Sequence, residues 1–333
     1  MPIEKQKNNA LLLCLSLSVV WGLGYILVPL GQRAGATSSF LCFLRFVLSG
    51  LIYGAIFIRK IKIKAKDLPI GLLAGMLLAV SFALQAYGQE YTTPSNSAFL
   101  TSMTTVFLPF LTWIFFRKKP SVLVYVSLAA YVAGVFVLSY NGSSFVFNLG
   151  DILILTSALT FALHYITVTY ALKRTDSQTF NFLQLTTAGI VLGVFFFAYE
   201  FKTQIVTPIA WGSFIVPLLA LVLFSTVYAY SVQTHAQKLL PPYQVSLVLS
   251  LENVFGAAFS VIFGFEAFRI NMVFGGALMF GAVILAQVVP SLIKRKQSQV
   301  KLRAIYTSGE QAKTVNGTVD KQTPDHKAGA YLK

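Results

Sequence analysis

The sequence predicts an all-α polytopic membrane protein whose ten transmembrane helices form two inverted five-helix repeats. Three observations predict this fold class: long apolar runs, basic residues confined to alternate connections, and a residue pattern that recurs along the chain. Of the 333 residues, 56% are hydrophobic and 11% are charged, and the mean hydropathy is +0.71. Soluble globular domains have about 25% charged residues, so this composition excludes that class.

The apolar runs set the number of spans, because a helix needs about 20 apolar residues to cross a bilayer. Ten runs have suitable lengths, at residues 10–30, 38–58, 68–88, 95–116, 122–140, 149–171, 178–200, 209–235, 241–264 and 272–293. The connections are short and leave no room for an extramembrane domain. Residues 297–333 are polar without an apolar period, which predicts a disordered cytoplasmic tail.

The first run has an alternative interpretation as a signal peptide that ends near Ala36. It is longer than the apolar core of a typical signal peptide, which favours a retained first span. The internal repeat described below also requires this span. We therefore expect residues 1–9 to form a cytoplasmic N-terminus.

Basic residues alternate between the two sets of connections. One set contains Lys5, Lys7, residues 59–66, residues 117–119, Lys173, Arg174, Lys238 and residues 294–296. The other set contains only Arg33, Lys202 and Arg269. Basic residues favour the cytoplasmic side, so we expect a protein of the inner (plasma) membrane with both termini in the cytoplasm. This clustering explains the net charge of +15 and argues against a nucleic-acid partner.

The second half of the chain repeats the first. An offset of 148 residues places Gln85, Gln89, Pro94, Val106 and Phe107 on Gln233, Gln237, Pro242, Val254 and Phe255. The same offset places Thr104 on Glu252, and an offset of 140 places Tyr25 on Tyr165. We expect the repeats to occupy residues 10–140 and 149–293. Because five spans is an odd number, the two copies insert in opposite orientations, an architecture common in transporters.

Several stretches carry a resemblance to a known family. They are VVWGLGYILV at 19–28, FLRFVLSG at 43–50, NSAFLTSMTTVFLPFL at 96–111, NLGDILILTSALTFALHY at 148–165, SLENVFGAAFSVIFGFE at 250–266 and FGGALMFGAVIL at 274–285. In this order they resemble the EamA-type transporters of the drug/metabolite transporter superfamily, over residues 8–293. Asn253 departs from the proline of many members, and Phe265 interrupts a Gly-Glu pair. The resemblance implies secondary transport of amino acids, metabolites or drugs, mostly as export.

Glu252 is the carboxylate of the ninth run and lies close to the expected middle of the bilayer. A charged group there costs about 2.5–3.5 kcal/mol on insertion scales, so such residues usually have a function. Desolvation disfavours the charged form of a carboxyl group, which lets it load and release a proton. Glu252 is therefore a candidate proton or cation site. Its alternative is a structural glutamate that is satisfied by Asn253 or by a facing hydroxyl.

Arg45 and His164 are the other ionisable candidates inside the runs. Arg45 would attract an anionic group of a substrate, or it would pair with Glu252 or extend to the outer interface. His164 shares a helix face with Ser157, Thr160 and Thr167. It would relay a proton or donate to a substrate, or simply form a packing hydrogen bond. No second ligand lies near it in sequence, so no metal site is expected.

Polar and aromatic residues complete the candidate pathway. Gln85 on the third run and Gln233 and Tyr230 on the eighth would line a polar cavity, or else form interhelical hydrogen bonds worth about 0.6 kcal/mol each. Trp21 and Tyr25 lie one turn apart and would form an aromatic wall, with a core or interfacial role as the alternative.

The sequence contains no nucleotide-binding motif and no catalytic motif, so we expect neither an enzyme nor a cofactor. The predicted function is a secondary active transporter that moves a small organic metabolite, such as an amino acid or related compound, by alternating access and proton-coupled export. Its expected partners are the substrate, membrane lipid and a proton gradient. The GxxxG spacing of Gly50 and Gly54 favours packing inside the bundle, with a homodimer as the alternative. The alternative function is a non-cycling membrane subunit that binds a lipid or a partner protein.

Overall fold

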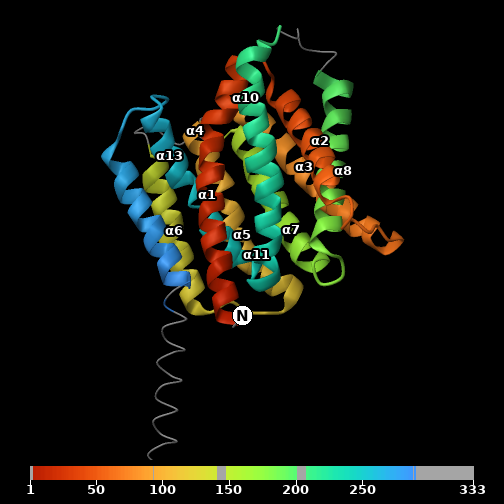
Figure 1. Cartoon of the computed structure of the whole chain (residues 1–333). Helices are drawn as coiled ribbons and strands as arrows, with labels where there is room; N and C mark the ends of the chain where they lie inside the picture. The colour runs from red at the N-terminus through yellow and green to blue at the C-terminus, as the bar shows by residue number, and fades with distance from the viewer. Residues whose placement is uncertain (1–2, 93, 141–147, 201–207, 288, 290–333) are drawn as a thin grey trace, which may run out of the picture. The chain divides into compact units, whose positions relative to one another are not determined.

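The computed structural model describes residues 3–92, 94–140, 148–200, 208–287 and 289 (Figure 1). These residues contain ten helices that are long and apolar enough to cross a membrane, and no strand. The predicted all-α fold class with ten spans is therefore confirmed. The predicted tail at 297–333 lies outside the described residues.

The helices of the first half follow the predicted runs closely. They are α1 (Ile3–Arg33), α2 (Ser38–Phe57), α3 (Leu68–Tyr91), α4 (Pro94–Thr101), α5 (Met103–Phe116) and α6 (Val122–Ser139). A short 3₁₀ turn, η1 (Ala65–Asp67), precedes α3. Thus α4 and α5 together form the fourth span.

The second half contains two π-helical segments in addition to α-helices. Its elements are α7 (Leu149–Ala171), α8 (Ser177–Phe195), η2 (Phe196–Glu200), α10 (Trp211–Val222), η3 (Leu223–Tyr228), α11 (Ala229–Leu239), α12 (Pro242–Leu249), α13 (Glu252–Ile262) and a last helix over Ile270–Gln287. The segment η3 joins α10 and α11 into the eighth span, and α12 and α13 form the ninth.

Local sequence signals explain where these helices begin. Asn148 caps α7 by accepting a hydrogen bond from the backbone N–H of Asp151, whose carboxylate accepts one from the N–H of Asn148 in return. Asp176 caps α8 in the same way, through the N–H of Thr179. These side chains satisfy N–H groups that a first helical turn leaves without partners.

The basic connections meet at one end of the bundle. Thr175 donates its hydroxyl hydrogen bond to Asp67 at 2.9 Å, and the N–H of Lys62 donates to the hydroxyl of Thr179 at 2.9 Å. The ammonium of Lys173 lies 4.6 Å from the ring centre of Phe116. These contacts join the connections after α2, α5 and α7, and we call this region the basic end.

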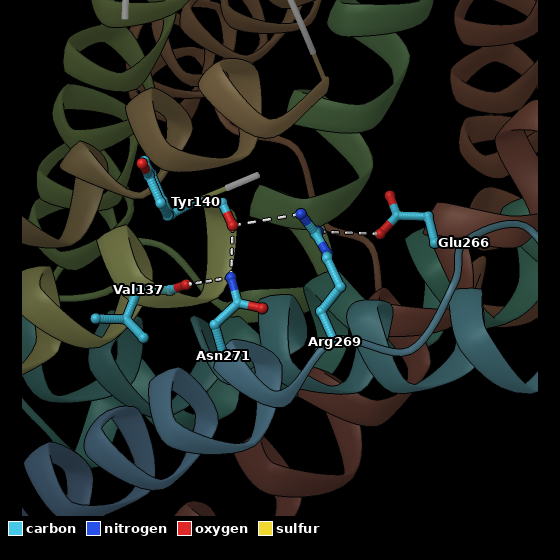
Figure 2. A network of polar contacts seen from close by, with 5 residues as sticks. All are labelled: Val137, Tyr140, Glu266, Arg269 and Asn271. Carbon is cyan, nitrogen blue, oxygen red and sulfur yellow. Dashed lines mark hydrogen bonds and ion pairs between the residues drawn. The ribbon is translucent and has the colours of Figure 1, made fainter. Parts of the chain in front are cut away.

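Figure 2 shows the contacts that close α6 at the opposite end. Asn271 donates to the backbone carbonyls of Val137 and Tyr140, and Arg269 donates to the Tyr140 carbonyl at 3.3 Å. Arg269 also forms an ion pair with Glu266 at 3.7 Å. The last carbonyls of a helix have no partners inside it, and these side chains satisfy two of them.

Each half packs its broken span against a helix of the other half. The second part of the fourth span, α5, packs on α7, and the second part of the ninth span, α13, packs on α1. Glycines allow the close approach of α13: a Cβ atom on Gly22 would lie 2.6 Å from the Cβ of Phe255. Each half therefore lays its broken span against the first span of the other half.

Candidate functional site

The ninth span, predicted over 241–264 and observed over Pro242–Ile262, breaks immediately before Glu252. The helix α12 ends at Leu249, Ser250 and Leu251 form a turn, and α13 begins at Glu252. The N–H of Asn253 donates to the carbonyl of Ser250 at 3.2 Å, three residues earlier, and the Ser250 hydroxyl donates to the carbonyl of Leu247. Serine hydroxyls that bond back to the preceding turn tend to bend helices.

The fourth span breaks at the equivalent position. Ser102 separates α4 from α5, with φ −62° and ψ −17°, close to the −67° and −7° of Ser250. The N–H of Thr105 donates to the Ser102 carbonyl at 3.1 Å, as Asn253 does to Ser250. Ser102 and Ser250 are separated by the repeat offset of 148 residues. The break is thus a property of the repeat, and a tight turn inside a helix often marks a functional hinge.

The carboxylate of Glu252 is half-buried and makes no hydrogen bond or ion pair with another described residue. It interacts electrostatically with the guanidinium of Arg45. It also interacts with phenol groups contributed by α1, α6, α7 and α11, namely Tyr25, Tyr131, Tyr165 and Tyr230. Residues on helices of both halves therefore interact electrostatically with Glu252.

Asn253 does not satisfy Glu252, because its amide is engaged elsewhere. Its Oδ1 accepts from the Tyr25 hydroxyl at 2.6 Å, and its Nδ2 donates to the Ser102 hydroxyl at 3.0 Å and to the Ser250 carbonyl at 3.1 Å. One side chain thus joins α1 to both helix breaks.

Arg45 is buried on α2, and neither of the two structural alternatives drawn from the sequence describes it. It does not extend to an interface, and it forms no ion pair with Glu252. Its Nε donates to the Thr226 hydroxyl at 2.6 Å and its Nη2 to the carbonyl of Ser225 at 2.7 Å. No hydrogen bond from its Nη1 is found among the described residues.

The π-helical segment η3 provides these acceptors. The carbonyl of Ser225 accepts from Arg45 and also from the indole Nε1 of Trp21, at 3.1 Å. A π-helical turn changes the regular backbone ladder and is frequent at functional sites. The sequence interpretation placed Thr226 on the polar face of the eighth span but did not include Ser225 or a π-helical turn. Its apolar surroundings carry no signal for a π-turn.

His164 lies buried on α7 at the end of a hydrogen-bonded chain. Asn181 donates from Nδ2 to the carbonyl of Tyr230, which fixes the orientation of its amide. Its Oδ1 therefore accepts from Gln184 Nε2 at 2.8 Å, and Gln184 Oε1 accepts from the Nε2–H of His164 at 2.9 Å. The sequence interpretation missed Asn181 and Gln184, although two polar residues one turn apart in an apolar run are a detectable signal.

The remaining candidates are distributed unevenly. Gln85 is half-buried and donates to the Thr101 hydroxyl at 3.3 Å, whereas Gln233 is buried and neither of its amide atoms has a hydrogen-bond partner among the described residues. Thr104, the counterpart of Glu252, donates to a carbonyl of α7 at 3.1 Å. Tyr230 is buried, and its ring centre lies 6.5 Å from that of Trp21.

The pattern of one family matches both halves of the chain. The EamA-like transporter family matches residues 8–140 and again residues 148–287. This chain belongs to the EamA-like transporter family. It is accordingly an integral membrane protein whose two halves both match the EamA pattern, and the family name points to a transporter.

Two relatives agree with this assignment, and one solved structure shares the fold. A protein of Archaeoglobus fulgidus named as an uncharacterized transporter is 28% identical over 230 residues, which cover 68% of this chain and 71% of that protein. The uncharacterized transporter YvbV of Bacillus subtilis is 27% identical over 228 residues, or 67% and 72% of the two chains. A crystal structure of a protein with 12% identity covers 86% of this chain and 99% of its own, with a TM-score of 0.74, which shows the shared fold.

Proposed function

We propose that this EamA protein is a proton-coupled secondary transporter that exports a zwitterionic metabolite, an amino acid or a related compound, by alternating access. It would reside in the inner membrane with both termini in the cytoplasm and with repeats at residues 10–140 and 149–293. One observation carries the proposal: Glu252 lies unbonded at a helix break, within electrostatic range of Arg45 but not in an ion pair with it.

Opposite charges held apart suit a zwitterion. A substrate ammonium group would bind Glu252, and the substrate carboxylate would bind the Nη1 of Arg45, which has no hydrogen-bond partner among the described residues. A charge without a close partner is costly in a low dielectric, and a ligand that bridges both charges removes that cost. The buried hydrogen bonds to η3 hold Arg45 in place for this contact.

Aromatic rings around the pair favour an organic cation over an inorganic one. Trp21 and Tyr230 pack edge to face, and Tyr25 is anchored to Asn253 beside Glu252. An ammonium group over an aromatic face gains about 0.5–2 kcal/mol. His164, edge-on to Tyr230 with ring centres 6.1 Å apart, would position this wall rather than contact the substrate.

A single carboxylate also explains the coupling. Glu252 would bind either the substrate ammonium or a proton, but not both, so the substrate leaves when a proton replaces it. With Glu252 protonated and uncharged, the transporter then reorients its binding site to the other side of the membrane. Glu252 releases the proton there. Each cycle would exchange one substrate for one proton, and inward flow of protons would drive export.

The test is transport by the purified protein in proteoliposomes loaded with the twenty proteinogenic amino acids. After a pH gradient is imposed, mass spectrometry of the external medium measures which amino acids leave. We expect selective efflux that an ionophore abolishes, and loss of pH dependence in Glu252→Gln. The matched control is Glu266→Gln, which removes a surface carboxylate paired with Arg269 and should transport normally.

Two results would contradict the proposal. Efflux by Glu252→Gln with the pH dependence of the unmodified protein would remove the coupling role. Absence of any amino-acid efflux, together with co-purification of a stable partner protein, would favour the non-cycling membrane subunit instead.

A further inference from the structure

Residues related by the internal repeat are buried to different extents. Tyr25 is 38% exposed, whereas its counterpart Tyr165 is 7% exposed. Gln85 is half-buried, whereas its counterpart Gln233 is 1% exposed. The third pair behaves in the same way, since the first-half glutamine Gln89 is exposed and its counterpart is 4% exposed.

Hydrogen bonding follows the same division. Gln85 donates to Thr101 and Gln89 donates to Ser97, each at 3.3 Å. In the second half, both amide atoms of Gln233 and the Nε2 of Gln237 are buried without a partner among the described residues, and the Oε1 of Gln237 accepts from the Thr169 hydroxyl at 3.1 Å. A buried amide without hydrogen bonds destabilises the conformation that buries it. These groups therefore need another environment, which water or a polar ligand would supply.

The unequal pairs lie at opposite ends of the bundle. The helix α3 starts beside Asp67 at the basic end and runs away from it, so Gln85 and Gln89 lie toward the opposite end. The helix α11 runs toward the basic end, where Lys238 is in its last turn, so Gln233 and Gln237 lie near that end. Exposure at one end is thus matched by burial at the other.

We propose that the structure shows a state closed at the basic end, and that Gln233 and Gln237 line the closed half of the substrate path. This inference rests on the alternating-access part of the proposed function. In the second state the two repeats exchange their conformations: Gln233, Gln237 and Tyr165 become hydrated, while Gln85, Gln89 and Tyr25 become buried. Polar residues that are buried without hydrogen bonds in one state then line the hydrated substrate path in the other.

Substitutions at the symmetric pair Gln85 and Gln233 should then shift the equilibrium between the two states in opposite directions. Replacing Gln233 by leucine removes the unpaired amide from the closed basic end and stabilises that state. Replacing Gln85 by leucine removes a hydrogen bond from this state and an unpaired amide from the other one. Loss of one unsatisfied buried group corresponds to a shift of at least about fivefold in the equilibrium constant.

The two native cysteines provide a test without added labels. Cys14 on α1 is fully buried in an apolar cluster with Val232 and Ala236, the neighbours of Gln233 on α11. A variant with Cys42→Ser keeps Cys14 as the only thiol, so its rate of reaction with N-ethylmaleimide reports opening of the α1–α11 contact. The measurement uses the full chain in proteoliposomes, without an amino acid or a pH gradient.

In this background we expect Gln233→Leu to slow the labelling of Cys14 by at least about fivefold, and Gln85→Leu to accelerate it. Cooperative thermal unfolding and unchanged gel-filtration profiles would confirm that both variants are folded. An unchanged rate in Gln233→Leu, or changes of the same sign in both variants, would overturn the inference. Because no substrate is used, failure of amino-acid transport would leave this result intact, and the converse also holds.

If either variant does not fold, hydrogen exchange of the unmodified protein decides the question. We expect backbone amides of residues 229–239 to exchange more slowly than those of residues 81–91, because only the second-half path is closed. Equal or reversed protection would overturn the inference.

Discussion

The fourth and ninth spans share a backbone design and differ in chemistry. Each begins with an eight-residue helix, α4 or α12, then turns at a serine and continues as a second helix. Two residues after the serine, the ninth span carries Glu252, which has no hydrogen bond to another residue that the structure describes, while the fourth carries Thr104, which donates to a carbonyl of α7. Both repeats therefore keep the hinge geometry, and only the second places an ionisable group at it.

This difference shows how a duplicated unit can specialise. A turn that is satisfied by its own serine does not depend on the residue that follows it, so that position is free to change. In the first half the position supports packing. In the second half it interacts electrostatically with Arg45 and with tyrosines of both halves. Substitutions at matched positions can therefore separate structural effects from effects on transport.

The largest expected effect on stability comes from the contact of Gly22 on α1 with the ninth span. A Cβ on Gly22 would lie 2.6 Å from the Cβ of Phe255 and 3.0 Å from the backbone nitrogen of Gly256, so α13 would have to move. We expect Gly22→Val to destabilise the protein by up to about 3 kcal/mol, the upper part of the overpacking range.

The matched control for this variant is Gly24→Val on the same helix, where a Cβ meets no atom within 4 Å. Thermal unfolding in detergent measures both variants. Equal midpoints would show that the α1–α13 contact is not close.

A smaller effect on stability is expected at Asn253, the residue after Glu252. Asn253 makes three side-chain hydrogen bonds, whereas its counterpart Thr105 makes one, to Ser246. Membrane-protein hydrogen bonds average about 0.6 kcal/mol, so Asn253→Ala should cost about 2 kcal/mol and Thr105→Ala about a third of that. Chemical unfolding of both variants tests the ratio, and equal losses would argue against Asn253 as the connection between the breaks.

The smallest effect is expected at Thr104. Thr104→Val removes one hydrogen bond to the carbonyl of Ala158, at an expected cost of about 0.6 kcal/mol or less. The pH dependence of efflux should remain that of the unmodified protein. A change in that dependence would show that the first break also takes part in coupling, contrary to the asymmetry described above.

The sequence predicted the number of spans and their repeat because hydropathy and basic clusters are properties of single segments. It also made Glu252 a candidate site, since a carboxylate in an apolar run is conspicuous; the role of Glu252 stays a prediction. It could not predict the breaks at Ser102 and Ser250, because serine also occurs within intact helices. Whether its hydroxyl bends the helix by bonding to the preceding turn is not visible in the sequence.

The partners of Arg45 and His164 were equally hidden. They come from other helices, so the π-helical segment η3 and the chain through Gln184 depend on tertiary packing rather than on any local pattern. The sequence also could not predict that the buried amide of Gln233 has no hydrogen-bond partner among the described residues while Gln85 has one, because both are glutamines in apolar runs.

The most direct test measures proton movement in proteoliposomes that contain the pH dye pyranine, after external addition of the amino acids that the protein transports. The unmodified protein and Glu266→Gln should change the internal pH when the amino acids are added, and Glu252→Gln should not. A pH change in Glu252→Gln equal to that of the unmodified protein would contradict the assignment of proton coupling to the break in the ninth span.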